Sequence, residues 1–137
     1  MSYGSAAALQ TALYQRLTTD TEVVAAVGAA VFDMVPTGPL PPLYIVLGRD
    51  EQRDASDYTG AGAWHEAVIS VVAESASFLA AKEAARAVSD ALVDAPLSLS
   101  RGTLVSLRLM RALARQTENG TGRRIDLRFR ARIDDTD

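Results

Sequence analysis

The side chains with the most distinctive chemistry in this sequence are arginines near its end, which alternate with apolar residues. Every second position from 125 to 133 is apolar, occupied by Ile125, Leu127, Phe129, Ala131 and Ile133. Because successive side chains of a β-strand point to opposite faces, this period predicts a strand with one apolar and one cationic face. The cationic face would hold Arg124, Arg128, Arg130 and Arg132.

Such an arginine face has three interpretations. It could be a solvated sheet surface whose charges discourage aggregation, a protein interface whose guanidinium groups bind carboxylates, or a surface that binds nucleic acid. Arg108 and Arg111 come from the preceding strand and, by residue count, lie on its two opposite faces. The acidic balance of the whole chain and the lack of interleaved aromatic residues speak against DNA binding.

A second charged group consists of acidic residues between 50 and 57. Its members are Asp50, Glu51, Asp54 and Asp57. Their spacing does not match a calcium-binding EF-hand loop, which needs alternating acidic residues, a glycine and a distant glutamate. We therefore interpret the group as a solvated acidic loop or a partner contact and predict no metal site.

No arrangement of residues indicates catalysis or cofactor binding. His65 is the only histidine, and no nucleophile motif accompanies it, so it is interpreted as a polar residue of a strand. The Gly60-Ala61-Gly62 run precedes a strand, whereas phosphate binding uses glycines at the start of a helix. The sequence predicts no enzyme activity and no cofactor.

Composition sets further limits on function. The chain has 137 residues, of which 48% are hydrophobic and 23% charged, as in an ordinary globular domain. It has no cysteine, hence no disulfide, and no apolar run long enough to predict a membrane span. The net charge of −3 conceals an asymmetry: residues 1–100 hold 5 Lys/Arg against 12 Asp/Glu, and residues 101–137 hold 9 against 5.

The elements that must position these residues follow from hydrophobic periodicity. Apolar residues at steps of three and four predict a central helix over 75–94, with Phe78, Ala81, Ala85, Val88 and Leu92 on one face. Ser75 or Ser77 would cap its start. Two further helices are predicted over 5–17 and 21–27, the latter capped by Asp20 and ended by Gly28. Strands are predicted at 31–32, 43–48, 64–73, 104–113 and 122–133.

These elements predict a single α+β domain spanning residues 1–137. We expect a mainly antiparallel sheet of about four strands with two to three helices packed on it. An acidic flexible loop is expected at about 50–63, because loops of this length are functional or disordered. Residues 134–137 are expected to form a frayed acidic tail.

Several segments, in their order along the chain, resemble one protein family. They include Ala8–Tyr14, Val31–Pro36, Pro42–Gly48, Trp64–Glu66, the alanine-rich helix with Lys82, Ala95–Leu97, Leu104–Leu107 and Arg128–Ala131. This succession is similar to the tail-completion, or tail-terminator, proteins of long-tailed phages and of phage-derived gene transfer agents. The likeness covers nearly the whole chain and rests on segment order, since no single motif is a chemical signature.

The resemblance implies a structural virion protein that is assembled in the bacterial host cytoplasm. Such proteins form a ring, usually of six copies, at the head-proximal end of the tail tube, where the ring ends tube growth and contacts the head connector. The implied partners are further copies of the chain, the tail tube protein and a head-side connector or stopper protein, with DNA only as passing cargo. A head-side stopper ring and a nucleic-acid-binding module using the 124–132 strand remain alternatives.

The charge asymmetry suits a closed ring, because a ring contact joins two different surface patches. We therefore expect the arginine residues to meet acidic residues of a neighbouring copy, of the tube or of the connector. The acidic loop from Asp50 to Asp57 is the first candidate partner.

Overall fold

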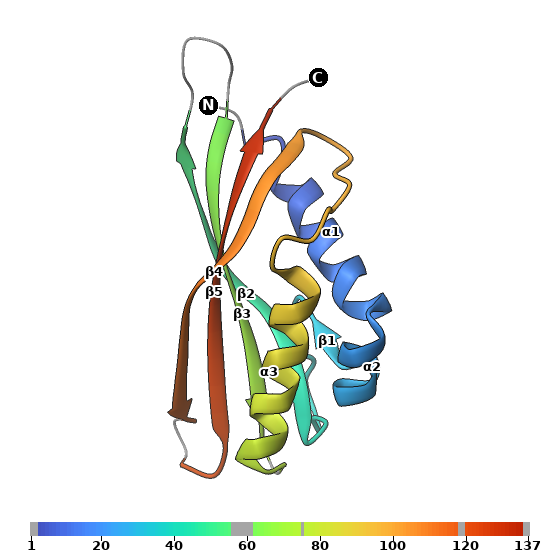
Figure 1. The fold of residues 1–137 in the computed structure, drawn as a ribbon. Coiled ribbons are helices and arrows are strands. Elements are labelled where there is room, and N and C mark those ends of the chain that lie inside the picture. Colours follow the sequence, from blue (N-terminus) through green and yellow to red (C-terminus); the bar gives the residue numbers. More distant parts are fainter. Residues whose placement is uncertain (1–2, 56–61, 75, 118–119, 136–137) are drawn as a thin grey trace.

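The chain folds into one twisted sheet of five strands with three helices on one of its faces (Figure 1). The computed structural model describes residues 3–55, 62–74, 76–117 and 120–135. Its elements in chain order are α1 (Ala6–Thr19), α2 (Thr21–Val27), β1 (Val31–Phe32), β2 (Leu43–Asp54), β3 (Gly62–Ala73), α3 (Phe78–Leu92), β4 (Thr103–Gln116) and β5 (Arg123–Asp134).

The strands are ordered β1-β2-β3-β5-β4, and only β1 is parallel to its neighbour. This arrangement confirms the predicted α+β class and the mainly antiparallel sheet. The brief strand predicted at 31–32 is present as β1, which pairs with Ile45 and Val46 of β2 and brings the sheet to five strands. β4 forms one edge of the sheet along its whole length.

The helix ends follow the local signals in the sequence. Asp20 accepts hydrogen bonds from the backbone N–H groups of Glu22 and Val23 at 3.0 and 3.1 Å, and α2 ends at Gly28, whose φ of +62° suits glycine. Ser77 caps α3 by accepting from the N–H of Ala80 at 3.1 Å. α3 ends at Leu92, two residues before the expected end.

The hydrophobic core lies between the helices and the sheet. The predicted stripe of α3 is buried from Ala81 to Leu92, and Phe78 packs against the core while partly exposed. α1 contributes Leu9, Leu13 and Leu17. The sheet contributes the apolar side of β5, which is buried at all five alternating positions as predicted. The opposite face of β5 is left uncovered by the helices.

Two bulges interrupt the alternation of side chains along β4. Leu104 pairs with Ile133 and Ser106 with Arg132, which leaves Val105 as an extra residue. Unbroken alternation would place Val105 on the same side as the buried Leu107, but Val105 is 57% exposed, and Leu104 packs against the core in its place. A bulge inserts one residue and thereby resets which positions face the core.

The acidic loop and the acidic tail are both shorter than expected. β2 continues to Asp54 and β3 begins at Gly62, so both ends of the expected 50–63 loop belong to strands. Asp134 is the last residue of β5, and Asp135 pairs with Arg101 at 3.0 Å. The remaining parts of both segments, residues 56–61 and 136–137, lie outside the described residues.

Candidate interaction surface

The sheet face that the helices leave uncovered, called here the open face, is strongly cationic. Cross-strand register places nine arginines and four acidic residues at its outward positions, a net charge of +5. The arginines are Arg49, Arg53, Arg108, Arg111, Arg115, Arg124, Arg128, Arg130 and Arg132, and the acids are Glu51, Glu66, Asp126 and Asp134. The four arginines predicted on β5 therefore share one face, as expected, and belong to a larger cluster.

The second bulge of β4 corrects the prediction for Arg108 and Arg111. By residue count they would lie on opposite faces, but Met110 is an extra residue between Leu109 and Arg111. Arg108 consequently pairs with Arg130, and Arg111 pairs with Arg128. Both β4 side chains therefore join the open face. A count of alternating residues could not find this, because the bulge is defined by pairing with β5.

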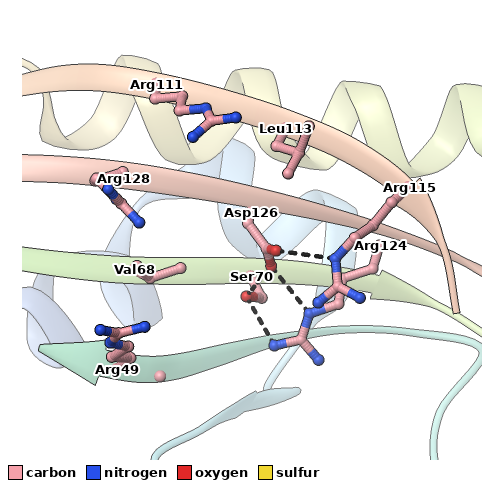
Figure 2. A pocket seen from close by; sticks show the side chains of 10 residues that line it. Arg49, Val68, Ser70, Arg111, Leu113, Arg115, Arg124, Asp126 and Arg128 are labelled. Carbon is pink, nitrogen blue, oxygen red and sulfur yellow. Dashed lines mark hydrogen bonds and ion pairs between the residues drawn. The ribbon is translucent and has the colours of Figure 1, made fainter. Parts of the chain in front are cut away.

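The open face contains a cavity of about 270 Å³, which is lined by residues of β2, β3, β4 and β5 (Figure 2). At one end Asp126 accepts from Arg115 at 3.2 Å, from Arg124 at 2.9 Å and from the Ser70 hydroxyl at 2.6 Å. Burial by itself would raise the pKa of Asp126, but hydrogen bonds from Ser70, Arg124 and Arg115 outweigh it and hold that pKa below the usual value. Arg115 and Arg124 are thus engaged within the chain.

At the other end of the cavity, guanidinium groups extend from three different strands. Arg49 comes from β2, Arg111 from β4 and Arg128 from β5 (Figure 2). Within the described part of the chain, none of the three forms an ion pair with a carboxylate. Glu51 and Glu66 line the adjoining hollow with Arg49 and Arg128, but three neighbouring cations that form no direct ion pair in the described residues repel one another, so this end of the cavity favours an incoming anionic group.

Arg130 and Arg132 have partners of their own. Their guanidinium groups lie 4.1 and 5.3 Å from the ring centroid of Trp64, the distance of a cation–π contact. Arg132 also donates to the carbonyl oxygen of Ala55 at 3.1 Å. Arg130 and Arg132 therefore stabilise the open face through contacts within the chain, whether or not they also contact a partner.

The acidic residues expected between 50 and 57 are divided between the two faces of the sheet. Asp50 pairs with Ala67 and Asp54 with Ala63, at positions that face the helices. Glu51 lies on the open face and forms an ion pair with Arg53 at 3.1 Å. Asp57 lies outside the described residues. The described members therefore do not form one acidic patch.

His65 is a buried residue of β3, in agreement with the interpretation of a structural strand residue. Its side chain is 3% exposed, and its Nε2 lies 3.4 Å from the Ser5 hydroxyl at the start of α1. Burial lowers the pKa of His65, and the negative charge of Asp50 partly opposes this shift. The folded chain therefore holds the imidazole neutral more strongly than the unfolded chain does.

The lowered pKa of His65 predicts a loss of stability in weak acid. As the pH falls below 6.5, the unfolded chain binds a proton at this residue before the folded chain does, so the free energy of unfolding decreases. The decrease should not exceed about 1.4 kcal/mol per pH unit, the limit for one proton. Denaturant unfolding at pH 7.5 and 5.5 tests this, with His65→Gln as the control that should flatten the dependence. An equal decrease in both proteins would contradict it.

The described residues hold no group of three or more acidic or histidine side chains placed to bind a metal ion. Nor does any helix in that part of the chain have the length and apolarity needed to cross a membrane.

Matches to known proteins include two that cover most of the chain. Residues 11–134 match the protein family described as tail completion protein gp17. The chain is also similar to one chain of a solved structure, the virion of a native gene transfer agent particle, with 56% identity and a TM-score of 0.91. That alignment covers 97% of this chain and 99% of the other. A search of curated proteins gave no match.

Proposed function

The chain belongs to the tail completion protein gp17 family, and we propose that it forms a ring at the head-proximal end of a tail tube. It is a structural protein of a phage-type or gene transfer agent tail, a role that requires no catalysis. In the proposed role the ring, of about six copies, ends tube growth and joins the tail to the connector of the head. The observation that carries this proposal is the 56% identity to a virion chain over nearly the full length of both proteins.

The open face is proposed as one of the surfaces through which the ring assembles. Its support is the +5 charge on a sheet face that no helix covers, together with the guanidinium groups of Arg49, Arg111 and Arg128. Guanidinium groups bind carboxylates in a bidentate manner, so the partner surface is acidic. The candidate partners are a neighbouring copy, including its segment from Asp50 to Asp57, the tail tube protein and the head-side connector.

Loss of the protein tests the proposed position. Particles assembled without it should contain tail tubes of uncontrolled length and heads that lack tails, because nothing stops tube growth or presents a surface to the connector. Electron microscopy of such particles measures both. A tagged copy should be located where the tube ends below the head.

The main alternative, a head-side stopper ring, predicts a different result in the same experiment. Tubes would keep their normal length, and the tag would be found on the portal side of the joint. Nucleic-acid binding through the 124–132 strand predicts duplex binding that weakens steeply with salt, since phosphate contacts release counterions. Titrations of the purified chain with duplex DNA at low salt measure it.

A further inference from the structure

The helix-covered side of the molecule carries a charge opposite to that of the open face. In the three helices and their flanking loops, residues 3–42 and 76–99, six acidic residues stand against three basic ones, a net charge of −3. The acidic residues are Asp20, Glu22, Asp33, Glu83, Asp90 and Asp94. The fold therefore places a cationic sheet face and an anionic helix layer on opposite sides of one domain (Figure 1).

The most concentrated acidic group of the helix layer surrounds Arg86 on α3. Three carboxylates share this one guanidinium: Glu83 at 3.1 Å, Asp90 at 3.1 Å and Glu22 of α2 at 3.6 Å. All three carboxylate side chains are at least 60% exposed. One arginine cannot neutralise three carboxylates, so this acidic cluster presents excess negative charge to the solvent.

An apolar groove of about 350 Å³ lies beside this cluster, between α3 and the hairpin of β4 and β5. Leu109, Ile125 and Leu127 line it from the sheet. The small side chains of Ala85, Ala112 and Ala114 leave it hollow, and Ser89 of α3 also lines it. Lys82 and Arg86 of α3 also line the groove, and the carboxylates of Glu83 and Asp90 lie next to it through their ion pairs with Arg86.

The open face instead combines exposed apolar side chains with cationic ones. Leu113 is 43% exposed and lines the arginine cavity beside Arg111, and Met110 at the bulge is 52% exposed. An exposed apolar side chain among arginines is complementary to an apolar groove whose Arg86 carries exposed carboxylates. Specific interfaces have this general composition, with an apolar centre and a charged rim.

We propose that the open face around Leu113 of one copy packs onto the α3 groove and acidic cluster of the next copy. In this contact Arg111 and Arg128 meet Glu83 and Asp90, and Leu113 enters the groove. The two patches differ and lie on opposite sides of the domain, so each copy can bind two neighbours, and a suitable rotation closes the series into a ring. This inference rests on the proposed function, because it specifies how the ring assembles.

Copies could also form a ring by pairing their edge strands, but the structure of β4 is less suited to this contact. β4 is a sheet edge, but bulges at Val105 and Met110 interrupt its regular ladder. Bulges and charges on an edge strand oppose the addition of another strand. A contact between the two faces leaves this edge unpaired and uses the side chains that the structure exposes.

Cysteine cross-linking in purified tails tests the contact directly, because the chain has no native cysteine. A chain carrying both Leu113→Cys and Ser89→Cys should form disulfide-linked multimers on oxidation, up to the full ring. The two positions lie on opposite faces of the sheet, so a disulfide between them joins different copies. The matched control pairs Leu113→Cys with Met34→Cys, an 85% exposed site outside both patches, and should give about tenfold less multimer.

A charge exchange provides the second measurement. Arg111→Glu with Arg128→Glu, or Glu83→Arg with Asp90→Arg, should each prevent incorporation into tails, and the chain with all four substitutions should regain it. If the unsubstituted chain enters tails but the chain with Leu113→Cys and Ser89→Cys forms no disulfide-linked multimers there, this contact is overturned and the proposed function is left intact. The same holds if the fourfold exchange does not restore incorporation. Absence of the unsubstituted chain from tails would overturn the proposed function itself.

Discussion

Arg111→Glu combined with Arg128→Glu is expected to abolish incorporation of the protein into tails while the chain remains folded. Both side chains project from the open face, and neither forms an ion pair in the described part of the chain, so their replacement breaks no internal ion pair there. The double substitution lowers the charge of the open face from +5 to +1. Losing one partner of a buried interfacial ion pair costs about 2–5 kcal/mol, so two per contact should reduce association by more than about a thousandfold.

Incorporation is measured by the amount of the protein in purified particles and by the fraction of heads with tails. Arg111→Lys with Arg128→Lys is the matched control, which keeps the charge and should retain a substantial part of assembly. Circular dichroism and a denaturation midpoint should be unchanged in both variants. Normal particles formed by the glutamate variant would remove the open face from the assembly contacts. Arg130 is unsuitable for this test because its guanidinium stacks on Trp64 at 4.1 Å.

Phe129→Ala is expected to lower the free energy of unfolding by about 3–5 kcal/mol. The side chain is 1% exposed in the centre of β5, where Ala67 of β3 and Leu109 of β4 flank it in the register. Its removal takes apolar area out of the core and leaves a cavity that small neighbours such as Ala67 cannot fill. A domain of this size typically has only about 5–15 kcal/mol of total stability, so the variant should be marginally folded.

Urea unfolding followed by circular dichroism measures this effect. Leu79→Ala is the control, since Leu79 is 69% exposed on α3 and should cost less than about 0.5 kcal/mol. Equal losses in the two variants would show that the core does not rely on β5. A destabilised but folded Phe129→Ala chain should also assemble poorly at higher temperature, unlike the arginine variants, whose defect does not depend on unfolding.

The opposition between a cationic sheet face and an anionic helix layer has consequences for purified protein. Patches of opposite sign on one chain attract other copies of it, and dissolved salt screens this attraction. Association through the proposed contact should therefore weaken with rising ionic strength more than association through an apolar groove alone would.

Local structure was determined by the sequence itself, because its signals act over a few residues. The period of two in residues 125–133 specified β5 and its two faces, and burial follows it at every position. Asp20 and Gly28 specified both ends of α2 through a side-chain cap and a positive φ. The stripe from Ala81 to Leu92 specified the buried face of α3. The family resemblance also follows from the sequence itself, because the order of segments along the chain carries it.

The tertiary structure alone decided which of these residues meet. The bulges at Val105 and Met110 exist only relative to β5, and they turn Arg108 and Arg111 toward the same face. The hydrogen bonds of Asp126 with Arg115, the groove beneath α3 and the division of the acidic residues between two faces likewise depend on strand register. Register is fixed by pairing between segments far apart in the chain, and a one-residue shift moves a side chain to the opposite face. Local patterns do not contain that information.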